Sequence, residues 1–492
     1  MTLLLDLVDE ALQFAVELTA GHTAAKDLSL ARERLREPLR VAIAGRVKAG
    51  KSTLLNAVVG ERLAKTDASE CTQVVTWYRY GDRYSVDYRT IDGRKGELRF
   101  DRNQGRLDIH LDGRDPAELD DIEVRWPARR LTELTLVDTP GMESTAAGAS
   151  ERTRRFFSLD EEAPGRADAV IYLMRHLHAS DVSFLETFLD RSVAQPSPFN
   201  AIGVLSRADE LGAGRLDAMA SARAVADRFA EDRRVRSLCS GVVAVAGLLA
   251  ETGVTLIEDE MAALRAVARS DPSELEGMLL SVDRFRDPAV SDVSSQQRGH
   301  LLDRFGLFGL RFALQRLETD PGISTPELSN AMVEESGLPA LLRSLADRFG
   351  PRAEVLKSRS ALAEMLAVAA GLSRDDAAVA GRISARVEAI EAASTELSEL
   401  RLWQLVSTGE VELTDDEVEE VRNVVSSIEP AVQLGLDPNT PRSELANTAL
   451  IGVERWRTKA SHPLSDRSTQ EVGELVARSF ESVYARLADR PG

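Results

Sequence analysis

The chain has 492 residues and a formal net charge of −19, and 43 % of its residues are hydrophobic, 29 % charged and 5 % aromatic. This length is too great for one hydrophobic core and suggests about three domains, while the abundance of Ala, Leu, Arg and Glu favours helices. The negative charge excludes nucleic acid as the main partner, because a surface that binds phosphate backbones is basic.

Residues 3–18 repeat apolar side chains at helical spacing, and a second helical stretch ends at Pro38. No stretch reaches the roughly 18 uninterrupted apolar residues of a membrane span, and the first residues lack the basic leader of a secretory signal. We therefore expect a cytoplasmic protein that is peripheral on the inner face of the plasma membrane. Cys71 and Cys239 are too few for a disulfide framework, so we expect packing residues in a reducing compartment.

From residue 39 the periodicity changes to short apolar runs, which are typical of buried parallel strands. These runs are residues 39–44, 134–137, 169–174, 201–205 and 242–246. Helical segments lie between most of them, and residues 74–126 contain further short strands and hairpins broken by Asp-Gly and Gly. The pattern predicts an α/β domain with a mostly parallel sheet and helices on both faces.

From about residue 256 the sequence is helical almost to its end. Amphipathic patterns predict helices at 306–318, 337–349, 351–372, 377–405, 414–429, 443–459 and 466–489. The helices at 3–18, 351–372 and 466–489 each need a partner for an apolar stripe, so we expect them to bundle together. The predicted segments are helices at 1–39, an α/β domain at 40–348, a helix at 349–372, a helical bundle at 373–465 and a last helix at 466–492.

The sequence GRVKAGKS at 45–52 matches the phosphate-binding loop G-x-x-x-x-G-K-[ST], after a strand and before a helix. Its two glycines let backbone N–H groups wrap phosphates without a Cβ in the way. Lys51 places a cation on the β- and γ-phosphates, and the Ser52 hydroxyl suits Mg²⁺. The matching flanks disfavour the alternative, a glycine-rich turn without a ligand. The predicted nucleotide contacts here are Gly45, Arg46, Val47, Lys48, Ala49, Gly50, Lys51, Ser52 and Thr53.

Asp138 begins an Asp-Thr-Pro-Gly motif at the end of the run 134–137. A carboxylate at this point can hold Mg²⁺ through water, and the Gly141 N–H can sense the γ-phosphate, although the motif alone also occurs in plain turns. Thr72 is the candidate for a mobile threonine that joins Mg²⁺ in the triphosphate state. Thr76 is its rival, and an ordinary strand threonine stays open. The predicted Mg²⁺ site is thus Ser52, Thr72 and, through water, Asp138.

Ser206-Arg-Ala-Asp209 follows the run 201–205 and resembles the [TN]-K-x-D guanine motif. An acidic Asp209 accepts hydrogen bonds from guanine N1–H and the 2-amino group, which adenine cannot match. Arg207 replaces the usual lysine; we expect its aliphatic stem to cover the base, with its head group placed differently. A helix cap is the alternative reading of the motif. Ala246 and Gly247 are candidates for a base-proximal loop.

His176 and His178 follow the run 169–174, and their spacing raises the question of a metal site. No cysteine or carboxylate clusters with them in the sequence. We therefore expect a loop near the nucleotide rather than a metal site.

The motifs GRVKAGKSTLLNAVVG, CTQVVT, DTPG and SRAD, followed by a long helical half, resemble the bacterial dynamin-like proteins. The resemblance implies a GTPase domain, a helical neck built from both chain ends, and a helical trunk whose tip touches lipid. It also implies association through the GTPase faces in the GTP state, with a second copy or with a related dynamin-like partner, coupled to membrane remodelling.

Two positions of the loop depart from the eukaryotic members, which have a Gln-Ser pair where this chain has Val47 and Lys48. Lys48 is expected to supply positive charge near the β–γ bridge, and it joins Lys51, Ser52 and Thr72 as a predicted catalytic residue. The departure leaves the means of stimulating hydrolysis open, and we expect slow basal turnover.

Turns at 400–413 and 456–465 are expected at one distal end of the helical half. The membrane-binding residues predicted there are Arg401, Leu402, Trp403, Leu405, Val406, Trp456, Arg457 and Lys459. Such a mixture of aromatic and basic groups suits an anionic phospholipid membrane. Nearby carboxylates at 415–420 oppose it, and packing of both tryptophans inside the bundle is the alternative.

Three functions compete. The leading one is a dynamin-like GTPase that hydrolyses GTP to GDP and phosphate with Mg²⁺ and couples homodimer or homo-oligomer formation to membrane binding and remodelling. Fission is favoured over fusion because the sequence shows no transmembrane anchor or long apolar paddle. The second is a regulatory GTPase switch whose helical half binds a protein partner. The third, an ATP-dependent enzyme, conflicts with the guanine motif.

Overall fold

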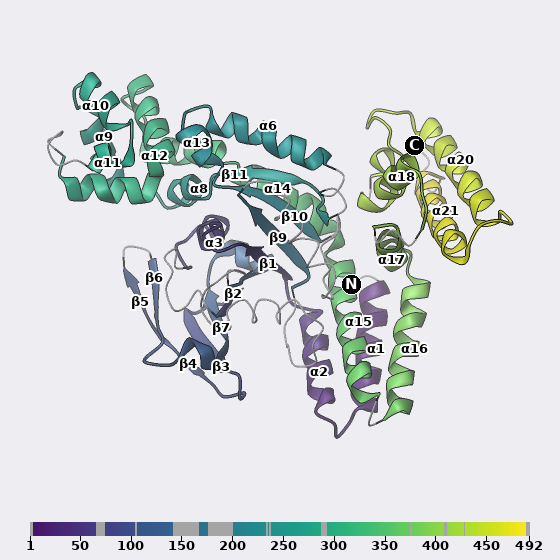
Figure 1. The fold of residues 1–492 in the computed structure, drawn as a ribbon. Coiled ribbons are helices and arrows are strands. Elements are labelled where there is room, and N and C mark those ends of the chain that lie inside the picture. Colours follow the sequence, from purple (N-terminus) through teal and green to yellow (C-terminus); the bar gives the residue numbers. More distant parts are fainter. Residues whose placement is uncertain are drawn as a thin grey trace. The chain divides into compact units, whose positions relative to one another are not determined.

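The computed structural model describes residues 3–64, 74–103, 106–140, 167–175, 200–232, 235, 238–286, 293–373, 376–407, 411–427 and 429–488. The chain forms two compact units (Figure 1). Residues 38–350 make up the first, which we call the α/β unit, and residues 1–37 with 351–492 make up the second, the helical unit. Within the described ranges, no helix combines the length and the hydropathy that crossing a bilayer requires.

The α/β unit is built on a nine-stranded sheet. In spatial order its strands are β11 (Val242–Val245), β10 (Ala201–Ser206), β9 (Ala169–Met174), β1 (Leu39–Gly45), β8 (Leu134–Asp138), β2 (Val75–Tyr80), β7 (Leu119–Trp126), β3 (Ser85–Thr90) and β4 (Lys95–Glu97). The strands from β11 to β8 are all parallel, and antiparallel pairs join β2 to β8, β3 to β7 and β3 to β4. The five strands predicted from apolar runs are confirmed as β1, β8, β9, β10 and β11, and every residue of β1, β9 and β10 is buried.

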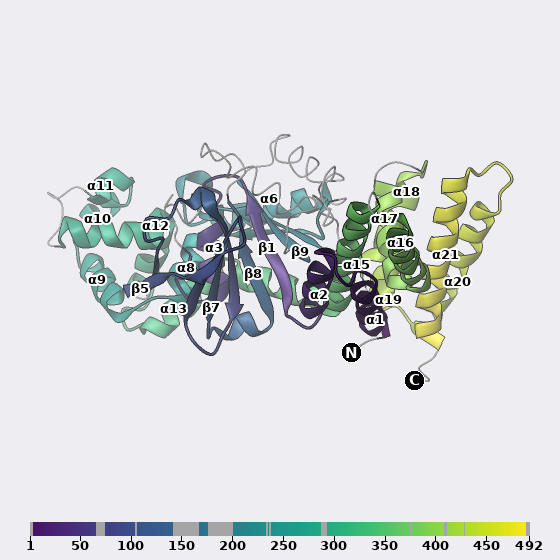
Figure 2. The ribbon, with the colours of Figure 1, turned by 90° about the horizontal axis from the view of Figure 1, so that it is seen from below.

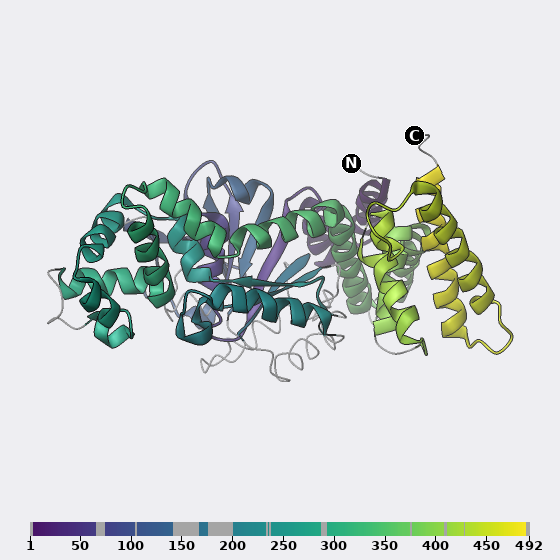
Figure 3. The same ribbon diagram turned by 90° about the horizontal axis from the view of Figure 1, so that it is seen from above.

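Helices cover both faces of this sheet, as predicted. The helices of the unit are α3 (Lys51–Val59), α6 (Ala218–Glu231), α8 (Gly247–Val254), α9 (Glu258–Ala268), α10 (Pro272–Met278), α11 (Val282–Arg286), α12 (Ser295–Thr319), α13 (Thr325–Glu335) and α14 (Leu338–Phe349). Figure 3 shows α6 and α14 on opposite sides of the β10–β11 end. A separate hairpin pairs β5 (Arg99–Asn103) with β6 (Arg106–His110).

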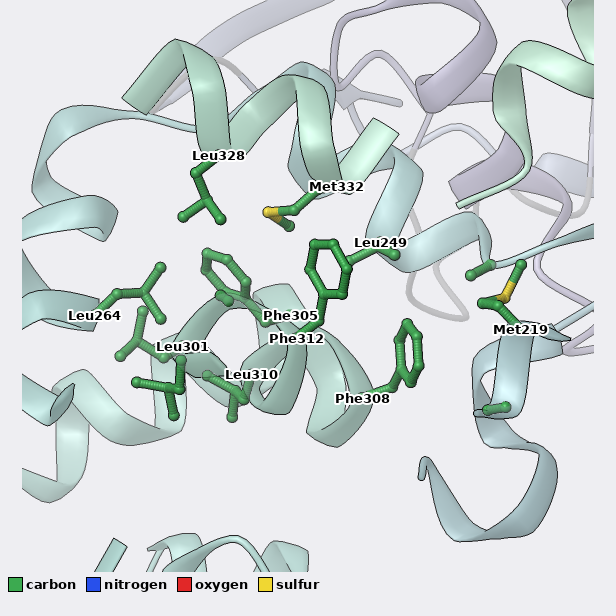
Figure 4. Packing of buried hydrophobic residues seen from close by; sticks show 14 of the residues in the cluster. Met219, Leu249, Leu264, Leu301, Phe305, Phe308, Leu310, Phe312, Leu328 and Met332 are labelled. Carbon is green, nitrogen blue, oxygen red and sulfur yellow. The ribbon is translucent and has the colours of Figure 1, made fainter. Parts of the chain in front are cut away.

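Helices α9 to α12 gather beyond one end of the sheet in the α/β unit (Figure 2). Their core is formed by Phe305, Phe308 and Phe312 of α12 together with leucine and methionine side chains from α8, α9 and α13 (Figure 4). The rings of Phe308 and Phe312 stack with centroids 6.4 Å apart. Gly306 has φ 61° and kinks α12, so its two halves can pack on different neighbours.

The helical unit contains α1 (Leu3–Leu18), α2 (Ala24–Arg34), α15 (Ala353–Leu372), α16 (Ala377–Ala393), α17 (Thr395–Ser407), α18 (Asp415–Ser426), α19 (Pro430–Gln433), α20 (Arg442–Ala460) and α21 (Arg467–Ala488). One core joins α1, α2, α15, α16 and the start of α17. An ion pair and a hydrogen bond also tie the N-terminal segment to α15. Arg34 pairs with Glu364 at 3.0 Å, and the Lys357 ammonium donates to the Leu35 carbonyl at 2.8 Å.

The prediction of one helix over 377–405 is wrong. The helix that starts after Asp376 ends at Ala393, and Ser394 starts the next helix by accepting from the Leu397 N–H at 3.2 Å. Ile383 and Val387 of α16 pack into the core with α15 and α1. The apolar stripe predicted on this segment is confirmed, and α15 and α1 cover it.

The expectation that helix 466–489 bundles with 3–18 and 351–372 is also not what the structure shows. In the described residues, α21 packs along α20 and against α17, and α16 takes the expected place. Two glycines explain why α21 packs on α20, because they let these two helices approach closely. A Cβ added at Gly452 would lie 2.5 Å from Phe480, and one added at Gly473 would lie 2.9 Å from the Cβ of Ala460.

Candidate nucleotide-binding site

The loop between β1 and α3 has the backbone of a phosphate cradle. Gly45 has φ 150°, and a Cβ there would lie 2.8 Å from the Leu173 carbonyl of β9, so only glycine fits. Gly50 has φ 92° and directly precedes α3, which places the amino end of that helix at the loop. Lys48 also takes a positive φ of 61°, and Val47 is exposed.

The Lys51 side chain lies back over this loop. Its ammonium donates to the carbonyls of Gly45 and Arg46, both at 3.3 Å. Burial lowers the pKa of Lys51, and the neighbouring Asp138 carboxylate opposes the shift. The negative charge of a triphosphate would favour the charged lysine, so the site is suited to an anion.

Ser52 and Asp138 meet beside the loop, as a shared metal site requires. Ile43 of β1 stands in register with Asp138 of β8, and the Ser52 hydroxyl donates to Asp138 Oδ2 at 2.9 Å. Burial raises the pKa of Asp138. Its Oδ1 is buried and has no hydrogen-bond partner among the described residues. A buried carboxylate oxygen without a donor, next to a serine hydroxyl, fits the hard oxygen ligands that Mg²⁺ prefers.

Thr139 is a residue of this site that sequence reasoning passed over. Its hydroxyl donates to the Ile43 carbonyl at 2.9 Å and holds the end of β8 against β1. Its position between Asp138 and Pro140 in the Asp-Thr-Pro-Gly motif is the sequence signal from which it could have been identified. Thr76 is buried in β2, stands in register with Asp138 and donates to the Val74 carbonyl at 3.3 Å.

Several predicted residues lie outside the described ranges. These are Cys71, Thr72, Gly141, His176 and His178. Cys239 is described and buried, and burial raises the pKa of its thiol to about 12. It is a packing residue, as expected.

The SRAD segment lies at the end of β10. Ser206 donates to the Met174 carbonyl at 3.1 Å, and Arg207, with φ 52°, donates to Glu210 at 2.7 Å. A short 3-10 helix, η4 (Ala208–Ala213), begins at this turn and carries Asp209. Burial raises the pKa of the Asp209 carboxyl to about 6.

A cavity of about 190 Å³ connects the loop with this segment. Its lining includes Ala49, Gly50 and Thr53 from the loop and α3, Ser206, Arg207 and Asp209 from the guanine motif, and Gly247 from the start of α8. Ala246 is buried behind it, and its N–H donates to the Ser336 carbonyl at 2.9 Å. The predicted phosphate and base ends are therefore brought together around one space.

Sequence reasoning did not identify the apolar wall of this cavity. Leu173, Val204 and Leu248 line it, and Glu210 lines it while it accepts from Arg207 and Arg175. Leu173 and Val204 belong to buried strands, and an apolar residue in such a strand is expected from core packing alone. Only their position at carboxyl ends of parallel strands indicates a ligand.

A mostly parallel sheet whose first strand enters a glycine-rich loop, with an aspartate at the next strand end, defines the P-loop nucleotide hydrolases. The Dynamin family model matches residues 41–208. The isoniazid-induced protein IniC of Mycobacterium tuberculosis is 40 % identical over 460 residues, which are 93 % of this chain and 92 % of IniC. A bacterial dynamin-like protein of Nostoc punctiforme is 32 % identical over 139 residues, which are 25 % of this chain and 19 % of that one.

The chain belongs to the dynamin family, and its α/β unit is a GTPase domain that acts on GTP. The resemblance seen in the motifs is confirmed. A solved chain from an oligomerised bacterial dynamin pair, described as a mechanism for long-range sensing and tethering of membranes, aligns with 99 % of this chain and 75 % of its own length, at 14 % identity and a TM-score of 0.30. A score this low does not establish a shared arrangement of domains.

The residues predicted to bind membrane lie in α17 and α20 of the helical unit. Leu402, Trp403, Val406 and Trp456 are buried, and Leu405 is half-buried. The Trp456 indole N–H donates to Glu420 at 2.9 Å. Arg401 pairs with Glu471, Arg457 with Glu481 and Lys459 with Glu417. The tryptophans thus pack inside the unit, which is the alternative that the sequence left open.

Proposed function

We propose that this GTPase couples Mg²⁺-dependent hydrolysis of GTP to self-association and to the binding and remodelling of anionic membranes, with fission favoured over fusion. The observation that supports the chemistry is the contact of Ser52 with Asp138, whose second carboxylate oxygen has no partner in the described residues. The observation that supports coupling is that both chain ends combine in one helical unit outside the GTPase domain.

Mg²⁺ would be held by the Ser52 hydroxyl and by Asp138 through water, with Thr72 as the predicted third group. The ion would neutralise charge on the β- and γ-phosphates. Lys51 binds the same phosphates as a cation, the Gly50–Ser52 backbone aims N–H groups at them, and Lys48 adds positive charge near the β–γ bridge. Asp209 orients the base at the other end of the cavity.

For the membrane contact we retain the predicted turn at 456–465 but assign the lipid-facing role to Leu464. This side chain is 89 % exposed in the turn between α20 and α21. Trp403 and Trp456 are packed, so lipid contact through them would require opening the bundle. The neighbouring basic residues are paired with carboxylates, and a free basic residue at an anionic surface contributes only about 1 kcal/mol. One chain is therefore expected to bind weakly, and association would have to multiply the effect.

Flotation with vesicles that contain anionic lipid tests this proposal. With a non-hydrolysable GTP analogue, the protein should float with the vesicles, and Leu464→Asp should reduce the floated fraction severalfold. Ile451→Asp is the matched control, because Ile451 is 55 % exposed on α20 but lies away from the turn. Equal flotation of both variants and the unaltered protein would remove the turn from the proposal. No flotation of the unaltered protein would favour a GTPase switch that binds a protein partner.

A further inference from the structure

A second and larger hollow lies in the α/β unit among α9, α10 and α12. Its volume is about 830 Å³, and it shares no lining residue with the nucleotide cavity. One wall is the second half of α12, another is the pair α9–α10, and Leu216 and Pro321 complete the rim. We call this hollow the α9–α12 groove.

Leucines form much of the lining of the groove. Leu314 and Leu317 also belong to the buried core around α12, part of which, with Phe305, is drawn in Figure 4. On the open side, Leu216 is 44 % exposed and Leu280 is 60 % exposed. Large apolar side chains that line a hollow yet remain exposed indicate a surface that an apolar ligand would cover.

Two half-buried arginines of the groove, Arg265 and Arg311, form no ion pair with a carboxylate of the residues that the structure describes. Arg265 donates to the carbonyls of Pro321 and Ile323 at 2.9 and 2.6 Å, and Arg311 donates to those of Ala213 and Leu279 at 2.9 and 2.6 Å. Carbonyls satisfy the donors but leave the positive charge. Within the described residues, neither guanidinium forms an ion pair, and burial lowers the pKa of Arg311.

A third arginine, Arg269, lies in the lining and is exposed, and the described residues offer its side chain neither a hydrogen bond nor an ion pair. The groove also has two carboxylates, Glu276 and Glu318, and both are exposed. The half-buried part of the groove is therefore cationic, whereas its acidic groups remain in water. A ligand with an apolar body and one anionic group matches this arrangement.

We propose that the α9–α12 groove binds a single-chain anionic amphiphile, an acyl chain that ends in a carboxylate. The acyl chain would cover Leu280, Leu216 and the leucines of α12. Its carboxylate would form an ion pair with Arg269 and would also be attracted by the positive charges of Arg265 and Arg311. The volume falls in the range of roughly 300–1,000 Å³ that is usual for small-molecule sites, which favours one acyl chain over a protein segment. The proposal does not depend on the membrane role proposed above.

Isothermal calorimetry of the full chain with dodecanoate, below the concentration at which it forms micelles, tests the site. We expect one dodecanoate bound per chain. Arg269→Glu should weaken binding about tenfold by replacing an attraction with a repulsion, and Arg269→Lys should keep most of it. Leu280→Asp should weaken it by a similar factor. Dodecan-1-ol, which lacks the charge, should bind more weakly than dodecanoate and should not distinguish Arg269→Glu from the unaltered protein.

Arg228→Glu is the matched control, because Arg228 is exposed on α6 and does not line the groove. This variant should bind dodecanoate as the unaltered protein does. The proposal is overturned if dodecanoate does not bind, if several molecules bind with an affinity that Arg269→Glu leaves unchanged, or if Arg228→Glu weakens binding as much as Arg269→Glu. An acidic protein as the occupant would show as absent binding of dodecanoate.

Discussion

Lys51 is the residue on which the chemistry of the site depends most. Its side chain is half-buried and its ammonium is held by two carbonyls of the loop, so it is already placed where phosphates would bind.

Lys51→Ala should lower kcat for GTP by at least about 100-fold and weaken nucleotide binding, because it removes a cation from the charge that develops during phosphoryl transfer. Phosphate release measures the first effect, and fluorescence of a labelled GDP measures the second. Ser52→Asn, which should keep the fold but disrupt the Mg²⁺ site, serves as the comparison. Turnover of Lys51→Ala at the rate of the unaltered enzyme would contradict the assignment of the loop.

We predict that Asp209, the proposed guanine-binding residue, makes GTP binding depend on pH. Burial raises the pKa of Asp209 to about 6, so its carboxyl is charged above that pH and becomes protonated as the pH falls through 6. Only the charged form would accept hydrogen bonds from both guanine N–H groups. GTP affinity should therefore drop by up to about tenfold per pH unit below 6. Asp209→Asn should flatten this dependence and shift preference toward xanthine nucleotides, because an amide donates where the carboxylate accepted. Equilibrium titrations between about pH 5 and pH 8 measure both. If Asp209→Asn bound GTP with unchanged affinity, Asp209 would not recognise the base and the motif would be only a helix cap.

Sequence alone predicted this site unevenly for a physical reason. Gly45, Lys51 and Asp138 were predictable because a phosphate cradle restricts the residue types at fixed spacings. The wall residues Leu173 and Leu248 were not, because a leucine at a strand end has the same sequence signature whether it packs against protein or ligand. Thr72 stays a prediction, since it lies outside the described residues.

At the scale of helices and strands, the sequence predicted most elements correctly but not which helices pack together. A buried parallel strand appears in the sequence as a short apolar run. The bounds of β1, β8, β9, β10 and β11 were therefore predicted to within about one residue. An amphipathic stripe shows that a helix has a partner but not which one. That is why the pairing of α16 with α15, and of α21 with α20, was missed.

Two glycine-to-alanine substitutions, one inside the close contact of α20 with α21 and one outside it, should change stability in opposite directions. Gly452→Ala should destabilise the helical unit by about 1–3 kcal/mol, because the new Cβ would overlap the Phe480 ring. Gly381→Ala, in α16, meets no heavy atom within 4 Å and should stabilise it by about 0.5–1 kcal/mol through helix propensity alone. Urea unfolding followed by circular dichroism measures both. Equal shifts of the two variants would contradict the packing of α20 on α21.

At the scale of the whole molecule, the chain joins a GTPase domain to a helical unit that closes residues 1–37 onto 351–492. The apolar stripes of helices 3–18 and 351–372 predicted that these distant segments pack together, and the family resemblance implied the same. The ion pair of Arg34 with Glu364 and the hydrogen bond from Lys357 to Leu35 join the N-terminal segment to α15.

Self-association in the GTP state is expected through the nucleotide faces. Sedimentation velocity of the chain with Mg²⁺, GDP and aluminium fluoride should show a dimer or larger oligomer, whereas GDP alone should give a monomer. Lys51→Ala, which should not hold the transition-state mimic, is the control and should stay monomeric. A monomer under both conditions at high protein concentration would count against association across these faces.

The most direct test of the central proposal is to image giant vesicles that contain anionic lipid with this protein and GTP. We expect GTP to produce tubules and smaller vesicles, and neither GDP nor the Lys51→Ala variant with GTP should do so. Phosphate release measured in the same sample keeps the enzyme and its membrane action separate. Vesicles that remain unchanged while the protein hydrolyses GTP would contradict a membrane-remodelling function.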